Sequence, residues 1–256
     1  MGARVVAVAN LKGGCGKTAT AVNLADMLAD AGERILLIDA SPQANATGYL
    51  GIDSREQERN LYELLYEGGR IEDYILDVFP GLSLIPSVMD LSAANMFFSE
   101  GGKAHDSDLR KMIEPILNDY DHIIFDCAPD FGLYTRCALY AADFYLFPTQ
   151  AEYLSYQGII TFREFSERAG GRIKDNLRRS RILLTMYSRN IRMTREMERR
   201  MTEEFHCELF NTRIRRGVRA SEAPSYSQTL RMLAPTAGVT MDYREFAREY
   251  KEYANT

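Results

Sequence analysis

The chain has 256 residues and a formal net charge of −5, with 46 % hydrophobic and 26 % charged side chains. This composition is typical of a globular protein with a buried core and argues against long disordered stretches. No apolar run approaches the roughly 20 residues that cross a bilayer, and the first residues lack the layout of a secretory signal. We therefore expect a cytoplasmic protein without a membrane segment.

The four cysteines indicate free thiols. They form no CxxC pair, and no cluster of histidines accompanies them, which argues against a zinc site. A chain of this size needs no disulfide to fold. The cysteines are Cys15, Cys127, Cys137 and Cys207.

Short apolar runs alternate with helical segments along the whole chain. This alternation predicts an α/β fold with three layers, in which helices cover both faces of a mostly parallel, twisted sheet. No linker divides residues 1–256, so we expect one domain. The more polar and helical segment 53–77 is expected to lie at the surface, near the phosphate-binding loop described in the next paragraph. The expected strands are 5–9, 35–38, 82–85, 122–125, 144–147, 181–185 and 208–210; the expected helices are 18–31, 108–118, 155–169, 194–205 and 242–253.

A glycine-rich segment, LKGGCGKT over residues 11–18, lies between the first expected strand and the first expected helix. Glycines let backbone N–H groups curl around phosphate oxygens, and the following helix adds its positive dipole end. Lys17 can then reach the β- and γ-phosphates, and the Thr18 hydroxyl can ligate Mg²⁺. The alternative is a glycine-rich turn without a ligand. The expected nucleotide contacts are Gly13, Gly14, Cys15, Gly16, Lys17, Thr18 and Ala19.

The loop departs from the common phosphate-loop pattern, because Leu11 replaces the first glycine and a second lysine, Lys12, follows. In this form it resembles the deviant Walker A motif of the ParA/MinD class of ATPases. Four further blocks in the same order resemble that class, closest to its ParA branch. The resemblance implies ATP and Mg²⁺ as cofactors and covers nearly the whole chain. The further blocks are DASPQANAT at 39–47, YDHIIFDCAP at 120–129, and FPTQAEY with RASEAPS at 147–153 and 219–225.

The resemblance assigns roles to three of these residues. It implies that Lys12 reaches across a nucleotide-sandwich dimer to the partner's phosphates; the alternative is a solvated surface lysine. It implies that Asp126 holds Mg²⁺ through water, with Asp39 sharing that work at the end of the neighbouring strand. The alternative for either aspartate is that it caps the following turn.

Ser41 stands where the family has an aspartate that activates or orients the attacking water. A serine hydroxyl cannot act as a general base near neutral pH. We therefore expect ATP to bind while hydrolysis is slow or absent, since loss of such a group costs on the order of 10²–10⁴-fold in rate. A weaker hypothesis is that Asp130 compensates.

The segment 172–219 is basic, with fourteen Lys or Arg and six Asp or Glu, a net of +8 in a chain of −5. In the ParA branch, arginines of this region bind DNA without sequence preference in the ATP dimer. The alternative is a solvated helix face with local ion pairs. The apolar stripe Met193, Met197, Met201 and Phe205 is expected to be buried. The arginines expected to contact DNA are Arg189, Arg192, Arg195, Arg216 and Arg219.

One further departure concerns the nucleotide edge. The family's Ile-Pro-Arg tripeptide is here Ile214-Arg215-Arg216, without the proline. This change puts the local loop shape and the adenine edge of the site in question.

These features predict an ATP-dependent, dimerising partition switch that coats the nucleoid and is released by a ParB-like or other activating partner. A non-hydrolysing, ATP-locked scaffold of the same fold is the alternative, and Ser41 favours it. A metabolic P-loop enzyme is a third possibility, but no residues in the sequence indicate a substrate pocket for it. The acids and bases mixed over 243–253 argue against a membrane-binding helix.

Overall fold

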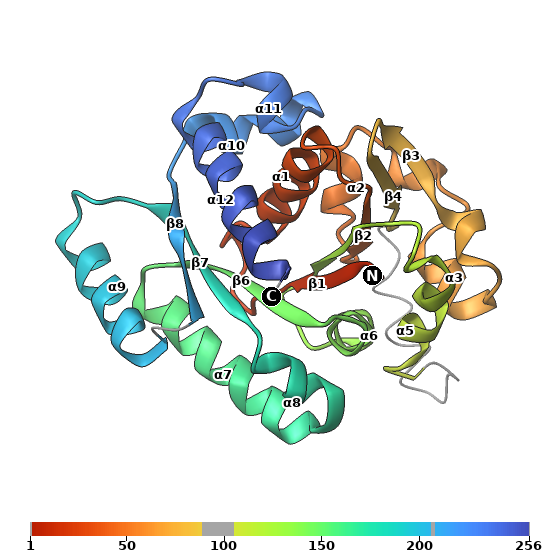
Figure 1. Ribbon diagram of the computed structural model, residues 1–256, viewed down its shortest axis with the longest axis horizontal. Coiled ribbons are helices and arrows are strands. Elements are labelled where there is room, and N and C mark those ends of the chain that lie inside the picture. The colour runs from red at the N-terminus through yellow and green to blue at the C-terminus, as the bar shows by residue number, and fades with distance from the viewer. Residues whose placement is uncertain (1, 89–104, 206–207, 256) are drawn as a thin grey trace.

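The computed structural model describes residues 2–88, 105–205 and 208–255. These residues form an eight-stranded sheet in the order β3-β4-β2-β5-β1-β6-β7-β8 (Figure 1). Neighbouring strands are parallel except for β3 and β4, so the predicted mostly parallel sheet is confirmed. The strands are β1 (Arg4–Val8), β2 (Ile35–Ala40), β3 (Leu76–Phe79), β4 (Leu82–Ile85), β5 (His122–Cys127), β6 (Phe144–Gln150), β7 (Arg181–Tyr187) and β8 (Leu209–Arg215).

The central strands are apolar on both sides because both faces of the sheet are covered. Successive residues of β1 belong to opposite cores: Val5 and Ala7 to one, Val6 and Val8 to the other. This alternation explains why the sequence of β1 reads as a continuous apolar run rather than as an alternating one.

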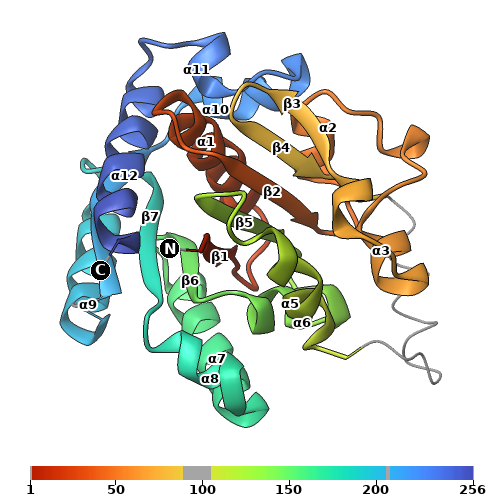
Figure 2. The same ribbon diagram turned by 45° about the vertical axis from the view of Figure 1, so that its right-hand side comes forward.

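Helices pack on both faces, as Figures 1 and 2 show. One face is covered by α1 (Lys17–Asp30), α2 (Asn45–Tyr49), α10 (Val218–Glu222), α11 (Leu230–Leu233) and α12 (Gly238–Ala254). The other is covered by α3 (Leu61–Glu67), α5 (Asp108–Ile113), α6 (Leu133–Ala141), α7 (Tyr153–Ala169), α8 (Gly171–Leu177) and α9 (Arg192–Phe205).

Three expectations need correction. The segment 53–77 is helical and mostly at the surface, as expected, but none of its residues lines the phosphate cavity. Leu61 and Leu64 of α3 anchor it in the core, and it leads into the antiparallel edge strand β3. The last strand continues to Arg215 instead of ending at residue 210. Met193, in the first turn of α9, is 61 % exposed and lies outside the core that Met197, Met201 and Phe205 join; the rest of that stripe is buried.

Two further observations concern the helices and the cysteines. No helix in the described ranges is long and apolar enough to cross a bilayer. Cys15, Cys127 and Cys137 are buried free thiols, whereas Cys207 lies outside the described residues.

Candidate nucleotide-binding site

The loop between β1 and α1 lines a cavity of about 310 Å³ at the carboxyl ends of the parallel strands. Gly14 and Gly16 have φ angles of +69° and +91°, which a residue with a side chain adopts only with strain. The helix α1 begins directly after Gly16, and its first turn contains no acidic residue. Its unpaired N–H groups and positive dipole end therefore favour an anion in this cavity.

Four separate segments meet around this phosphate cavity. Six of the seven residues expected to contact nucleotide are among them; the seventh, Cys15, is buried, and its carbonyl accepts a hydrogen bond from the Thr185 hydroxyl at 2.7 Å. The motif Gly-Lys-Thr alone does not predict that residues 43, 45, 129 and 186 also line the phosphate cavity. The lining residues are Gly13, Gly14, Gly16, Lys17, Thr18, Ala19, Ser41, Gln43, Asn45, Cys127, Pro129 and Met186.

Lys17 is folded over the loop that precedes it. Its Nζ donates a hydrogen bond to the carbonyl oxygen of Lys12 at 3.1 Å, and the residue is only 7 % exposed. A buried ammonium group next to the phosphate cavity is a strong electrostatic partner for phosphate, since water screens it little.

Asp126 lies near the end of β5, in register with Asp39 of β2 and Val8 of β1. Both of its carboxylate oxygens are buried, and neither has a hydrogen-bond partner among the described residues. Burial raises the pKa of Asp126 to about 8, and the charge of Asp39 adds to this rise, while Thr18 and Lys17 oppose it. A buried carboxylate without a partner beside a threonine hydroxyl fits a Mg²⁺ site, because Mg²⁺ takes few protein ligands and completes its shell with phosphate oxygens and water.

Asp39 has different surroundings. Its Oδ2 accepts hydrogen bonds from the Thr47 N–H and hydroxyl, both at 2.8 Å, and its Oδ1 accepts one from the Ser41 N–H at 3.2 Å. Burial raises the pKa of Asp39 to about 6, and these hydrogen bonds oppose the rise. The side chain thus holds the segment between β2 and α2, as the turn-capping alternative describes; its share in binding Mg²⁺ stays a prediction.

Ser41 lines the phosphate cavity and is held on three sides. Its N–H donates to Asp39, its hydroxyl accepts from the Gln43 N–H at 3.4 Å, and its carbonyl accepts from the Ser87 hydroxyl at 2.7 Å. Asp130 lies instead at the start of α6, where its Oδ1 accepts from the Gly132 N–H at 2.7 Å. It does not line the phosphate cavity.

Lys12 points away from the phosphate cavity. Its Nζ donates hydrogen bonds to Gln150 Oε1 at 2.8 Å, Glu152 Oε2 at 2.7 Å and the Ser155 hydroxyl at 3.2 Å. Its side chain is 25 % exposed, so these contacts are partly shielded from water. In a single chain, Lys12 is therefore bound to the start of α7 rather than solvated.

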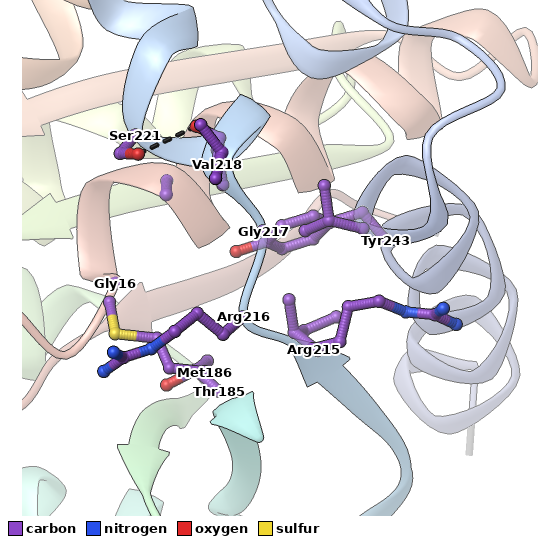
Figure 3. Close-up of a pocket in the computed structure, with 13 residues that line it drawn as sticks. Gly16, Thr185, Met186, Arg215, Arg216, Gly217, Val218, Ser221 and Tyr243 are labelled. Carbon is purple, nitrogen blue, oxygen red and sulfur yellow. Dashed lines mark hydrogen bonds between the residues drawn. The ribbon is translucent and has the colours of Figure 1, made fainter. Parts of the chain in front are cut away.

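A second cavity of about 360 Å³ continues from the first and shares Gly16, Ala19 and Met186 with it. Figure 3 shows its wall, built from the ends of β7 and β8, from α10 and from α12. Its surface is mainly apolar, which suits the flat face of a nucleotide base. We call this space the base cavity. Its lining residues are Gly16, Ala19, Thr185, Met186, Ile214, Arg215, Arg216, Gly217, Val218, Ala220, Ser221, Val239 and Tyr243.

Arg215, at the position of the family's proline, forms a clamp with Asp242 on α12. The Arg215 N–H donates to Asp242 Oδ2 at 2.9 Å, Nε donates to Oδ2 at 2.7 Å, and Nη2 donates to Oδ1 at 2.8 Å. A proline has no N–H and could make none of these bonds. The clamp thus joins the end of β8 to α12 beside the base cavity, and we refer to it as the Arg215–Asp242 clamp.

The arginines expected to contact DNA have three kinds of surroundings. Arg189, Arg192 and Arg195 are exposed near the start of α9. Their side chains form no ion pair or hydrogen bond within the described part of the chain. Arg219 is paired with Glu222 at 2.8 Å. Arg216 lines the base cavity, and Figure 3 shows its side chain extending toward Gly16 and Met186.

A glycine-rich turn between a parallel strand and a helix, with its lysine and a carboxylate on the adjacent strand, defines a P-loop nucleotide-binding protein. Comparison with known proteins gives the particular family. A family model described as an AAA domain matches residues 3–179. The chromosome-partitioning ATPase Soj of Thermus thermophilus is 36 % identical over 246 residues, covering 96 % of this chain and 94 % of that protein.

Two further matches agree with this assignment. The chromosome partitioning protein ParA of Caulobacter vibrioides is 33 % identical over 249 residues, which cover 96 % of this chain and 93 % of ParA. Cobyrinic acid a,c-diamide synthase of Mycobacterium smegmatis, solved with a bound ATP analog and magnesium, has the same fold, with a TM-score of 0.81 at 24 % identity over 99 % of this chain and 96 % of that one. The chain belongs to the ParA/MinD-type P-loop ATPase family.

Proposed function

We propose that this protein is an ATP-dependent switch of the ParA type that binds Mg-ATP, dimerises and then binds DNA without sequence preference. The observation that carries the first step is the phosphate cavity, which a helix N-terminus and Lys17 line. The unpaired carboxylate of Asp126 is buried directly behind its wall, next to the lining residue Cys127 and close to Thr18 and Lys17. Backbone N–H groups of the loop and Lys17 bind the β- and γ-phosphates. Thr18 and Asp126 hold Mg²⁺, which neutralises phosphate charge when bound.

Dimerisation follows from the face around the two cavities. Apolar side chains are exposed on the loops and helix starts that follow β6, β7 and β8, with Leu154 70 % and Val218 72 % exposed. Exposed apolar residues rimming a charged site are typical of a contact surface. A second copy on this face would bring its own phosphates toward Lys12, which must then leave Glu152.

The uncommitted arginines at the start of α9 support DNA binding. Arg189, Arg192 and Arg195 are exposed and lack ion pairs within the described residues, so they can neutralise phosphates. No element of this region is arranged to read base edges, which makes the binding independent of sequence. Two copies would double the patch, and a ParB-like or other partner would release it. Such a protein would act in the cytoplasm on the nucleoid, in line with the chromosome-partitioning names of its relatives.

Hydrolysis is slow in this proposal because Ser41 offers no carboxylate to the attacking water. The decisive experiment measures phosphate release with excess DNA and Mg-ATP for this chain and for Ser41→Asp. The proposal expects turnover to rise on the order of 10²-fold or more in Ser41→Asp. Equal turnover in both proteins would show that position 41 does not control hydrolysis.

A second candidate is a scaffold that remains locked as an ATP dimer, and the buried, fully held Ser41 is the observation that favours it. The lifetime of the ATP dimer distinguishes the two. A switch dissociates when the activating partner is added, whereas a scaffold persists for as long as ATP is bound.

DNA binding is tested by titrating salt against binding to a duplex in ATP and in ADP. Binding in ATP should weaken steeply with salt, and binding in ADP should be much weaker. A triple variant of Arg189, Arg192 and Arg195 to Gln should lose binding, while Arg168→Gln, an exposed arginine on α7, serves as the matched control. Equal binding in both nucleotides would overturn the switch.

A further inference from the structure

A third cavity, of about 260 Å³, lies at the opposite edge of the sheet from the nucleotide. Arg4 and Arg181 are the first residues of β1 and β7, and Phe144 is the first residue of β6. Because these strands are parallel, their amino ends are separated from the phosphate loop by the length of the sheet, about 16 Å along β1. The lining residues are Arg4, Asp143, Phe144, Arg178, Arg179, Arg181, Tyr253 and Ala254.

Four guanidinium groups line this space without a matching carboxylate. Among the described residues, no ion pair involves Arg4, Arg178, Arg179 or Arg181. The one acidic residue of the lining, Asp143, is already committed elsewhere: Arg172 donates to its Oδ1 at 3.0 Å, Arg110 lies 3.6 Å from the same oxygen, and the Val5 N–H donates to its Oδ2 at 3.0 Å. A cluster of four positive charges thus remains in a protein whose net charge is −5.

Within the arginine cluster, the Arg181 side chain is held in place by aromatic and backbone contacts. The Arg181 guanidinium lies over the ring of Tyr253, 4.2 Å from its centroid, and its Nη1 donates to the Ser180 carbonyl at 3.0 Å. The Tyr253 hydroxyl donates to the Arg179 carbonyl, and its ring packs edge-on against Phe144 at 5.3 Å. A positioned guanidinium loses less entropy on binding an anion than a free surface arginine does.

The cluster is not explained by helix ends alone. Arg178 and Arg179 follow the last residue of α8, where positive charge complements the helix dipole. Arg4 and Arg181 begin strands and share the cavity with Tyr253 and Ala254, the last residues of α12. Each helix end carries only about half a negative charge, so these two ends leave most of the four positive charges unbalanced. The guanidinium fork matches the oxygens of phosphoryl groups, and four forks around one space match a ligand with more than one such group.

We propose that this arginine cavity binds a small ligand that carries two or more phosphoryl groups. Its volume is below the usual range for drug-sized ligands, about 300–1,000 Å³, and suits a compact anion of the size of tripolyphosphate. A nucleic-acid duplex is too wide to enter it. This inference does not depend on the proposed function, because the site shares no residue with either nucleotide cavity.

Calorimetric titration with inorganic tripolyphosphate tests the inference on the full chain. The protein is first saturated with ADP in the absence of Mg²⁺, so that the phosphate loop is filled and the metal does not compete for the probe. We expect one tripolyphosphate per chain, with roughly tenfold or greater weakening in the double variant Arg179→Gln/Arg181→Gln. Arg168→Gln is the matched control and should bind as the unchanged protein does. Circular dichroism and ADP binding check that the double variant is folded.

Other outcomes separate this site from the phosphate loop and from DNA. Tripolyphosphate binding should survive Lys17→Ala; binding that is lost in Lys17→Ala and kept in the arginine double variant would overturn the inference. Absence of binding to the ADP-saturated protein would also overturn it. A 20-base-pair duplex is titrated in parallel: if the double variant weakens duplex binding and leaves tripolyphosphate unchanged, the surface holds nucleic acid and the small-anion site is wrong.

Discussion

The phosphate cavity and the base cavity share Gly16, Ala19 and Met186, yet their walls are built differently. The phosphate cavity is lined by a loop rich in backbone N–H groups and by an ammonium group, with the carboxylate of Asp126 buried behind its wall, and most of its residues lie near the ends of the adjacent strands β2, β5 and β1. The base cavity is mainly apolar and depends on the packing of β8 against α12. The first offers a few strong, localised charges; the second offers many weak contacts spread over distant segments.

This difference predicts where binding energy and sensitivity to mutation lie. Charge-assisted hydrogen bonds concentrate the affinity for ATP in single residues of the phosphate cavity. In the base cavity, each residue contributes little, and the shape of the wall matters more than any one contact. Variants can therefore be ordered by the expected size of their effect, starting with the phosphate cavity.

The largest effect is expected from Lys17→Ala. The ammonium group lies beside the phosphate cavity and is almost fully buried, so its removal should weaken ATP binding by roughly 100-fold, or ~3 kcal/mol. Equilibrium binding of a fluorescent ATP analogue measures the change. Lys12→Ala is the matched control, because Lys12 is bound to Gln150, Glu152 and Ser155, and monomer affinity should hardly change. Similar losses in both variants would contradict the separate roles of the two lysines.

Asp126→Asn should change the pH dependence of stability. The pKa of Asp126 is raised from 3.8 to about 8 in the folded, ligand-free protein, so the native state holds a proton that the unfolded state releases. Stability from this group is present below pH 4 and is lost as the pH rises toward 8, by on the order of 1 kcal/mol per pH unit. Asn carries no such proton, so the variant should gain stability over the unchanged protein as the pH increases.

Urea denaturation of the ligand-free proteins at pH 5, 6.5 and 8 measures this slope. The same variant should lose the contribution of Mg²⁺ to ATP affinity, because the neutral amide is a poor ligand for a hard cation. The opposite pH trend, or an unchanged response to Mg²⁺, would remove Asp126 from the metal site.

The same contrast explains how much of the molecule could be predicted from the sequence. The phosphate loop is local: strand, glycines, lysine and helix lie within about fifteen consecutive residues, so the pattern reveals them. The buried strands could be predicted because both faces of the sheet are covered, which makes their sequences continuous apolar runs. The missed elements have weak local signals: β3 is a short, partly exposed edge strand, and α6 follows β5 after a turn without a side-chain cap.

The base cavity could not be derived in this way, because its residues come from segments far apart in the chain. Thr185, Val239 and Tyr243 line one cavity only because α12 packs against α1 and Thr185 of β7 bonds to the loop before α1. Ile214, Arg215 and Arg216 do line the base cavity, but the sequence did not reveal that Asp242 would form an ion pair with Arg215. Charge counting over 172–219 also misled in part, since Arg199, Arg213, Arg215 and Arg219 are paired with acidic residues.

A moderate effect is expected from Val239→Ala in the base cavity. Val239 is buried in the cavity wall beside Gly217, and removing two methyl groups should weaken ATP binding about fivefold, or ~1 kcal/mol. Binding of ribose triphosphate, which lacks the base, should not change. Val218→Ala, at a position 72 % exposed on the same rim, is the control and should alter ATP affinity less than twofold. Equal weakening for both ligands would place Val239 outside the base cavity.

The smallest effect is expected from Asp242→Ala, which breaks the Arg215–Asp242 clamp. Arg215 has a 59 % exposed side chain, so water screens the pair and the cost in stability should be at most ~1 kcal/mol. ATP affinity should fall about threefold, because β8 and α12 lose their link beside the cavity. The loss should shrink at high salt, where the pair is already weakened. Glu245→Ala removes the exposed pair with Arg248 on the same helix, and should leave ATP affinity unchanged.

A second substitution tests why this chain lacks the family's proline. If the clamp replaces the proline in fixing the end of β8, the wall of the base cavity should keep its shape in Arg215→Pro without a contribution from Asp242. ATP affinity in Arg215→Pro should then be insensitive to a further Asp242→Ala change, whereas in the unchanged chain Asp242→Ala lowers it. Additive losses in the double variant would show that Asp242 acts on the cavity by another route.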